Sequence, residues 1–457
     1  EKSVYPLLVA QVTVMGDFSV SHADSNTRAR TGRFFGVETP ACTIPCRRGV
    51  PPHLTADLLT TVGGSPILQL PVGELQQHSH LLEQGGVHAV YSTGDVVTYA
   101  SFCDPWIEGS VHSGDKALGL DTPSGREKVT FEQWKAACLQ SKVNVVACYG
   151  EEIDATAGAK RNKRELERGL QWVNSAVADK VAPCVLANVQ GGGSRRAQAA
   201  ATAAKSNANG YRIGGLGFQE TVEQRYQALQ EVTHALPASK PRFLSCCGSP
   251  PEVLQAVMCG VDVVEAAYPM LLAQQGKALI MRIPTQDCSG MDQISPELRQ
   301  GVQPSVSQPV PKRRKLGINQ QLSQQGWPIM KCLDLSDIGF AKDYLPLMSD
   351  SCCAQYSRAY IHHLLNCKEL LAYTILTMHN VKIYDAFFCA IRPPSQGRKR
   401  RRLCWAGTGN SIRSDTAAGL AAEVMRSEAC CVRLWDKWVL LCHGRVEPVH
   451  GHVVQTS

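Results

Sequence analysis

Two adjacent cysteines and a downstream histidine have a spacing that suggests chemistry. Cys352 and Cys353 precede His379, which lies 26 positions after Cys353, and neither Gly nor Pro separates them. Thiolate sulfur and imidazole nitrogen are the ligands that structural zinc sites use, four to an ion. Cys and His side chains buried between helices would show the same pattern. The segment is therefore either half of a metal site or part of a helical core.

Four turns form a second set of candidates. They are NVQGGG (188–193), RIGGLGFQE (212–220), CCGSPPE (246–252) and VEAAYP (264–269). Paired glycines let a backbone approach a flat or anionic ligand closely. Glycine after a strand is also ordinary turn chemistry. Their meaning depends on the strands that would bring them together.

Short apolar runs alternate with longer segments of helical period between residues 65 and 270. The expected strands are Pro66–Val72, Val143–Tyr149, Pro183–Val189, Tyr211–Leu216, Pro241–Ser245 and Val261–Ala266. The expected helices are Lys163–Val177, Ser194–Ser206, Thr221–Leu236 and Pro251–Cys259. Continuous apolar strands spaced by amphipathic helices are typical of parallel βα units.

An open doubly wound sheet and a (β/α)₈ TIM barrel both fit this alternation. A barrel needs roughly 250 residues, which the chain supplies. No G-x-G-x-x-G phrase follows the first strand, which disfavours a dinucleotide-binding sheet. We therefore expect an α/β fold built on a barrel, whose strand ends would bring the four turns to one mouth.

The predicted domain organisation has five parts. They are an atypical N-terminal segment (1–34), the barrel body (35–286), a polar insert (287–330), a subdomain with the C-terminal helices (331–392) and an atypical tail (393–457). Within the subdomain, Asn366 followed by Glu369 resembles a capping box and predicts a break between two helices.

Charge and cysteine content bear on partners and compartment. The formal charge is +7, and basic clusters lie at 160–164, 312–315 and 398–402. Such clusters suit a polyanionic partner, or are solvated faces. The 19 cysteines follow no visible secretory leader, so reduced thiols and a cytoplasmic location are expected. No apolar run reaches the roughly 18 residues of a membrane span.

Several phrases, in order, resemble the tRNA-guanine transglycosylase family. They are VQGG, IGGLGFQE, GVDVVEAAYP, and Cys353 with YSRAYIHHLL and the following MHN. PPHLTADLL (51–59), CDP (103–105) and MDQI (291–294) resemble the non-catalytic accessory subunits of eukaryotic queuine tRNA-ribosyltransferases more than their catalytic partners. The resemblance covers residues 35–392. It implies a TIM barrel with an inserted helical zinc-binding-type subdomain.

The resemblance also implies a reaction. The family exchanges guanine for queuine, or a precursor, at the anticodon wobble position of tRNAs of the Asp, Asn, His and Tyr type. An Asp nucleophile attacks the ribose C1′ and leaves again. Here Glu265 stands at the nucleophile position, one methylene longer, and Gly150 stands where a base-reading Asp is expected. The D-S-G-G-F-Q phrase is absent, and Met270 and Leu271 replace the Thr-Arg of P-T-R.

These departures predict a non-catalytic subunit of a heterodimeric queuine tRNA-ribosyltransferase. It would support the catalytic subunit and help bind tRNA through the basic clusters at 160–168 and 195–196. The alternative is an active transglycosylase that uses Glu265 as its nucleophile. A third, unrelated reading is a phosphate-binding barrel enzyme. The resemblance further implies a peripheral association with the mitochondrial outer membrane.

The family's zinc pattern, C-x-C-x2-C-x25-H, makes Cys353 and His379 the last two ligands. Its first two positions hold Met348 and Asp350. A neutral thioether is a poor zinc ligand, whereas a carboxylate oxygen can serve. The zinc site that the resemblance implies is therefore degraded, rebuilt with Asp350, Cys352, Cys353 and His379 as its ligands, or damaged by a short deletion.

Overall fold

The computed structural model describes residues 18–282 and 329–392, apart from short gaps at 25–26, 64–65, 93, 95, 105, 107–110, 113, 115, 123–124, 154–157, 191–194, 217–219, 246–247 and 350. The predicted polar insert and tail lie almost wholly outside these residues.

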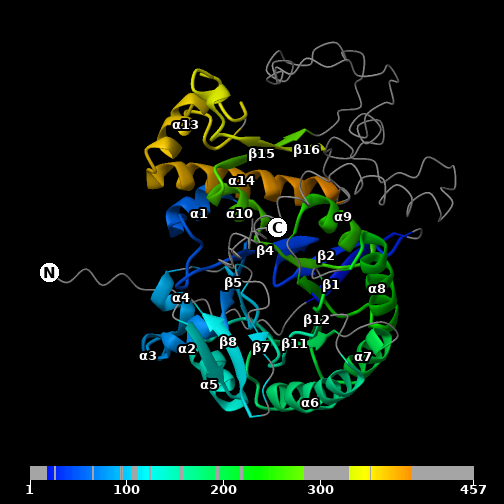
Figure 1. Ribbon diagram of the computed structural model, residues 1–457. Helices are drawn as coiled ribbons and strands as arrows, with labels where there is room; N and C mark the ends of the chain where they lie inside the picture. Colours follow the sequence, from blue (N-terminus) through cyan, green and yellow to red (C-terminus); the bar gives the residue numbers. More distant parts are fainter. Residues whose placement is uncertain are drawn as a thin grey trace, which may run out of the picture.

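Eight parallel strands close into a barrel, which confirms the predicted fold class (Figure 1). They are β4 (Ala41–Pro45), β5 (Ile67–Pro71), β6 (Val97–Ser101), β10 (Val145–Ala147), β11 (Cys184–Val189), β12 (Gly210–Ile213), β13 (Arg242–Ser245) and β14 (Val263–Glu265). Closure comes from β6 pairing with β10 and from β14 pairing with β4. Each of the six expected strands overlaps one of these, whereas β4 and β6 were not expected.

Helices form an outer layer around the strands (Figure 1). They are α1 (Ala56–Val62), α2 (Val72–Gln77), α3 (Ser79–Leu82), α4 (Gly86–Tyr91), α5 (Phe131–Ser141), α6 (Ala159–Ala178), α7 (Arg195–Ala204), α8 (Val222–Ala235), α9 (Pro250–Met258) and α10 (Tyr268–Gln274). Capping boxes begin three of them, with Thr130 before α5, Thr221 before α8 and Ser249 before α9. Each box satisfies backbone N–H groups that a helix start leaves unpaired.

The strands divide the barrel's apolar side chains into an inner and an outer core. Tyr99, Val263 and Phe243 belong to the cluster inside the barrel. Val264 and Tyr211 belong to the larger cluster between strands and helices. Side chains along a strand alternate between its two faces. The residue after Val264 on β14 and the residue after Tyr211 on β12 therefore point into the barrel.

Two antiparallel sheets accompany the barrel. The first contains β1 (Phe18–Ala23), β2 (Arg30–Phe34) and β3 (Val37–Thr39), so the predicted boundary at residue 34 falls inside it. The second contains β7 (Val111–His112), β8 (Leu118–Thr122) and β9 (Gly125–Val129).

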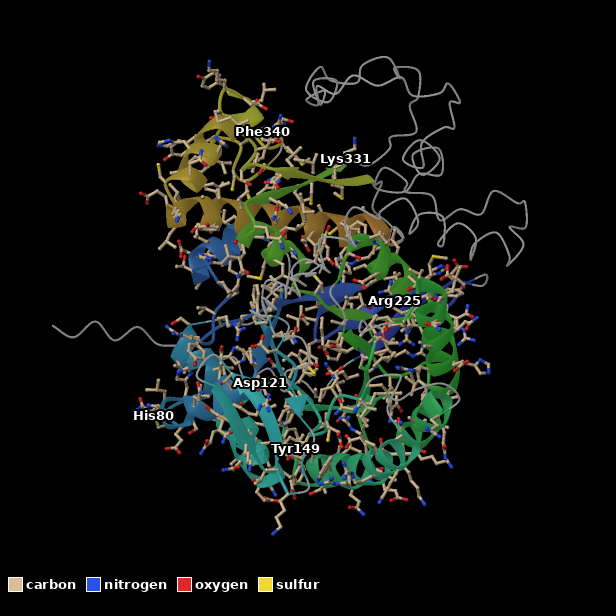
Figure 2. The ribbon with its side chains drawn as sticks, viewed as in Figure 1. His80, Asp121, Tyr149, Arg225, Lys331 and Phe340 are labelled. Carbon is tan, nitrogen blue, oxygen red and sulfur yellow. The ribbon has the colours of Figure 1, made fainter. Side chains whose placement is uncertain are left out.

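Buried polar contacts join both sheets to the barrel. Arg30 Nε donates to Asp262 Oδ1 over 2.8 Å, and both side chains are buried. Tyr149, which follows β10, donates its hydroxyl to Val129 O and accepts from Leu118 N (Figure 2). Each contact fixes one sheet against the barrel.

The remaining elements form a subdomain next to α10 (Figure 1). They are β15 (Lys277–Arg282), the antiparallel β16 (Ile329–Asp334), the 3₁₀ helix η2 (Ile338–Phe340), α13 (Arg358–Asn366) and α14 (Leu370–Ile391). The expected break between two helices is present. Asn366 ends α13, however, and Glu369 is the N-cap of α14 without a side-chain capping bond, so the capping-box interpretation was wrong.

Helix α14 connects the subdomain to the barrel. Ile375 and Leu376 belong to the subdomain's own apolar core, whereas Tyr384 and Phe387 pack into the outer core of the barrel. Among the described helices, none has the length and hydropathy of a membrane span.

Candidate functional site: the barrel mouth

Glu265 lies at the end of β14, points into the barrel and is 2% exposed. Arg212 from β12 approaches it with two nitrogens, Nε to Oε1 at 2.8 Å and Nη2 to Oε2 at 3.2 Å. Tyr99 from β6 donates its hydroxyl to Oε1 over 2.7 Å. Gln69 from β5 contacts Oε2 at 3.4 Å. Both carboxylate oxygens are therefore engaged by buried donors from three other strands.

Arg212 is shared with a second carboxylate. Its Nη2 lies 3.7 Å from Glu152 Oε2, and Glu152 also accepts from Gly215 N and from the Cys103 thiol. Burial raises the pKa of Glu152, but Arg212, Cys103 and Gly215 together lower that pKa below its usual value. Burial is also the main cause that raises the pKa of Tyr99, so its phenol stays protonated and donates to Glu265.

This arrangement is poorly suited to nucleophilic catalysis. A nucleophilic carboxylate needs an available oxygen within about 3–3.5 Å of the atom it attacks. The oxygens of Glu265 instead face a bidentate guanidinium and a phenol, and the side chain is almost fully buried. Charge-assisted bidentate pairs are among the strongest hydrogen bonds in proteins. Glu265 acts here as the acceptor of a buried ion pair.

The NVQGGG and RIGGLGFQE turns at the mouth are packed against the loop that follows β10. Gln190 accepts from Ile153 N at 3.1 Å and donates to Glu151 O, which ties the end of β11 to the loop after β10. A Cβ at Gly215, whose φ is +65°, would lie 2.0 Å from Ile153 O. Gly215 of the RIGGLGFQE turn therefore allows close backbone packing.

Gly150 occupies the position where the family resemblance expects a base-reading Asp. A Cβ there would lie 2.8 Å from both Glu165 Oε1 and Asn188 Nδ2. A longer side chain would require both neighbours to move. The position is therefore packed by adjoining polar side chains, not left open for a base.

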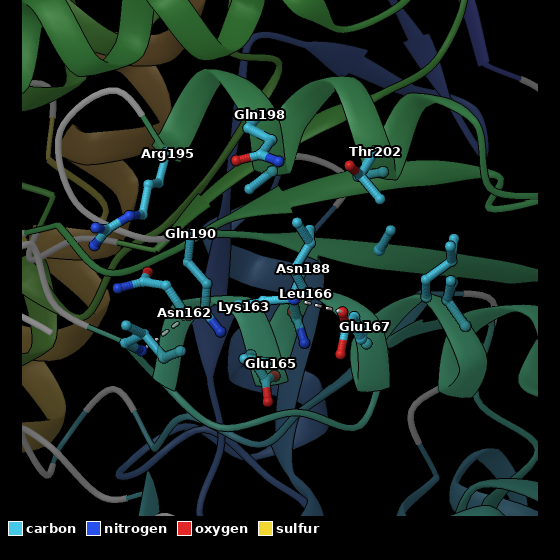
Figure 3. Close-up of a pocket in the computed structure, with 17 residues that line it drawn as sticks. Asn162, Lys163, Glu165, Leu166, Glu167, Asn188, Gln190, Arg195, Gln198 and Thr202 are labelled. Atoms are coloured by element: carbon cyan, nitrogen blue, oxygen red, sulfur yellow. Dashed lines mark hydrogen bonds and ion pairs between the residues drawn. The ribbon is translucent and has the colours of Figure 1, made fainter. Parts of the chain in front are cut away.

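A groove of about 370 Å³ lies between α6 and α7 (Figure 3). Lys163 and Arg195 line it from opposite helices, and Asn188 of β11 and the following Gln190 also line it. Its wall also carries Glu165, whose pKa is raised to about 8, mainly by burial and then by Glu151. The groove thus combines exposed cationic groups with a buried, protonated carboxyl.

The basic clusters on these helices are partly neutralised. Arg161 Nε donates to Glu151 at 2.8 Å, and Arg164 lies 3.5 Å from the same carboxylate. Arg196 is buried and donates to the carbonyls of Gly214 and Gly215. Arg196 is therefore a structural residue, whereas the neighbouring Arg195 is exposed.

The implied zinc ligands lie in the subdomain, away from the mouth, and Asp350 lies outside the described residues. His379 is fully buried, and both of its ring nitrogens contact oxygen atoms, Ser351 Oγ and Leu279 O. Cys353 donates its thiol to Ile375 O. Among the residues that the structure describes, no three His, Cys, Asp or Glu side chains are placed to hold a metal ion. As arranged, these side chains do not fit a zinc site, and zinc remains a prediction from the resemblance.

Comparison with known proteins identifies the family. The family model described as queuine tRNA-ribosyltransferase matches residues 24–394. The chain therefore belongs to the queuine tRNA-ribosyltransferase family.

Two of its relatives are accessory subunits. Queuine tRNA-ribosyltransferase accessory subunit 2 of Xenopus tropicalis is 30% identical over 375 residues, covering 78% of this chain and 89% of that protein. The human protein of the same name is 28% identical over 392 residues, covering 80% and 91%. A queuine tRNA-ribosyltransferase of Cyanothece is 26% identical over 394 residues, covering 80% and 89%.

Sequence reasoning found Glu265 but missed Arg212, its principal partner. The signal was an arginine inside an otherwise apolar strand, directly after Tyr211. A charged residue in a strand covered on both faces must be paired inside the protein. That argument would have predicted a buried acidic partner for Arg212, although not which one.

Proposed function

We propose that this protein is the non-catalytic subunit of a heterodimeric queuine tRNA-ribosyltransferase, which supports the catalytic subunit and helps it bind tRNA. The observation that carries the proposal is the state of Glu265. At the position of the family nucleophile, both carboxylate oxygens are held by Arg212 and by Tyr99 or Gln69. Such a residue maintains the barrel but is not available to bond to a ribose carbon.

The proposal places the surface that binds the catalytic subunit on the subdomain. Six of the ten exposed large apolar side chains in the described residues belong to it, namely Ile338, Tyr344, Leu345, Tyr360, Leu370 and Leu371. The loop that carries Tyr344 and Leu345 is bonded to the start of α13, where Arg358 N donates to Leu345 O over 2.8 Å. Figure 2 shows Phe340 of η2 on the same subdomain, far from the Tyr149 side of the barrel. An excess of exposed large apolar side chains on one part of a protein is typical of protein interfaces.

The groove between α6 and α7 supports the tRNA part of the proposal. The Lys163 side chain is 79% exposed, and its ion pair with Glu167 is long, at 3.9 Å. Lys160 and Arg195 are exposed as well. Phosphate contacts position a nucleic acid without reading its sequence, and each needs only an accessible cation.

The test measures incorporation of labelled queuine into unmodified tRNA of the Asp, Asn, His or Tyr type. This chain alone, the catalytic subunit alone and the mixture are compared. Incorporation in the mixture only, unchanged by Glu265→Gln in folded protein, is the expected result. Incorporation by this chain alone that Glu265→Gln abolishes would instead establish the active enzyme. Glu132→Gln on exposed α5 is the matched control.

The interface part has its own readout. Tyr360→Glu should weaken complex formation with the catalytic subunit in size-exclusion chromatography, because it places a charge among exposed apolar groups. Leu139→Glu on α5 makes the same kind of change at an exposed position of the barrel and should leave the complex intact. Equal effects of the two variants would refute this choice of surface.

A further inference from the structure

The subdomain that the resemblance assigns to zinc has a complete apolar core of its own. Leu335, Leu347, Ile361, Ile375 and Leu376 are at most 1% exposed and belong to one cluster. Small metal domains depend on their ion because they have too little apolar surface to bury. This subdomain continues into the barrel through α10 and α14, so a metal is not needed to supply its core.

His379 makes the contacts of a structural cross-link. Its Nε2 lies 2.7 Å from Leu279 O, and a carbonyl can only accept, so Nε2 carries the proton. Nδ1 of a neutral imidazole then has a lone pair, and Ser351 Oγ lies 2.7 Å from it. A zinc-bound histidine also donates its second N–H to a carbonyl, but its lone pair binds the metal. Here the Ser351 hydroxyl takes the place of the metal.

Ser351 extends this contact into the turn that carries Cys352 and Cys353, called the cysteine turn below. Its Oγ accepts from Cys353 N at 3.1 Å while its hydroxyl donates to His379. The Cys353 thiol donates to Ile375 O of α14 over 3.5 Å. The turn is thus bonded to α14 through neutral groups at two points, and neither of them requires a thiolate.

The residue after His379 completes the attachment to β15. Asn380 Oδ1 accepts from Leu279 N at 2.7 Å, and its Nδ2 donates to Lys277 O at 2.9 Å and to Pro269 O at 3.0 Å. Both backbone polar groups of Leu279 are therefore satisfied by consecutive side chains of α14. The cysteine turn, α14 and β15 form one hydrogen-bonded unit.

We infer that this subdomain folds without a metal ion, with the chain of hydrogen bonds Cys353 N–H, Ser351 O–H, His379 and Leu279 C=O in place of the family's Cys₃His zinc site. The inference does not depend on the proposed function. Its readouts are metal content and thermal unfolding, which stay informative whether or not the protein supports base exchange.

The first experiment is elemental analysis of the full-length protein, purified without added metal or chelator, with thermal unfolding before and after exposure to a strong chelator. We expect far less than one zinc per chain and an unchanged Tm. One zinc per chain, removed by the chelator with a fall in Tm and absent from Cys353→Ser, would overturn the inference.

The second experiment distinguishes a zinc site from the chain of hydrogen bonds by removing a single atom, Ser351 Oγ. Ser351→Ala retains all four implied ligands, so a zinc site predicts an unchanged Tm. The hydrogen-bond model predicts a Tm lower by about 2–6 °C, because the buried Nδ1 loses its donor. Ser336→Ala in the exposed turn after β16 is the matched control, and an equal Tm for wild type and Ser351→Ala would contradict the inference.

The third experiment rebuilds the family pattern. Met348→Cys with Asp350→Cys restores C-x-C-x2-C-x25-H, and this double variant should bind one zinc, whereas Met348→Ser with Asp350→Ser should not. Zinc binding by the double Cys variant but not by the wild type shows that the wild-type donor set is what excludes the metal. One zinc per chain in both the wild type and the double Cys variant would refute the inference.

Discussion

The barrel mouth and the subdomain both lack residues that the family resemblance would place there. The residue that stands at the family's functional position is held by an ion pair at the mouth and by neutral hydrogen bonds in the subdomain. At the mouth, Glu265 forms a buried ion pair with Arg212. In the subdomain, His379 is held by neutral hydrogen bonds to Ser351 and Leu279. A buried charge requires a charged partner, whereas a buried neutral imidazole requires only a donor and an acceptor. The mouth should therefore be far more sensitive to loss of one partner.

Removing Arg212 should have the largest effect. Arg212→Leu leaves Glu265 and Glu152 buried without their cation, and breaking a buried pair in this way costs about 3–5 kcal/mol. Equilibrium denaturation by urea would measure the loss. Combining Arg212→Leu with Glu265→Leu should recover part of it, because an apolar pair can replace an ion pair. If the single variant lost under 1 kcal/mol, the ion pair would not be organising the mouth.

Removing His379 should cost less. His379→Leu preserves much of the volume but leaves Leu279 O and Ser351 Oγ without their partner, and we expect a loss of about 2–4 kcal/mol. The same denaturation experiment measures it. If His379→Leu lowered the unfolding free energy as much as Arg212→Leu, the ion pair at the mouth would not be more sensitive to loss of a partner than the neutral hydrogen bonds of His379.

The pH dependence of stability should come from the barrel. Burial and Glu151 raise the pKa of Glu165 to about 8 in the folded state, from its ordinary value of 4.5. Between these values the folded state binds the extra proton, so stability from this group falls as pH rises, by at most about 1.4 kcal/mol per pH unit. Glu165→Gln should flatten the profile between pH 5 and 8. If the unfolding free energy varied with pH in the same way in wild type and Glu165→Gln, other groups would cause the pH dependence.

The smallest effect on stability should come from Lys163. Its contact with Glu167 is exposed, so Lys163→Gln should change the unfolding free energy by less than about 0.5 kcal/mol. It should nevertheless weaken tRNA binding and reduce the salt dependence of log Kd by roughly one unit of slope. Glu167→Gln is the control, since it removes the same ion pair but keeps the cation. Unchanged tRNA affinity in Lys163→Gln would exclude this face as a tRNA contact.

Local sequence pattern determined most elements of the barrel and the helical subdomain. The spacing of apolar residues within one segment indicates which of its faces is buried. It can be read from that segment alone, as in the apolar run Pro183–Val189 and the amphipathic segment Lys163–Val177. The sequence pattern did not predict the strands β4 and β6. The proline of Thr39–Pro40 precedes β4 directly and Pro45 ends it, and β6 lies among polar turn residues, so neither resembled a buried strand.

The sequence by itself also placed Glu265 at a strand end and set the interval between Cys353 and His379. Only the tertiary structure decided what these residues bind. Arg212 reaches Glu265 because both side chains point into the barrel, from β12 and β14 on either side of β13 and 53 positions apart. Ser351 meets His379 because α14 packs against the cysteine turn. Local periodicity fixes which face of an element is buried, but the partner of a buried polar group depends on how distant elements meet.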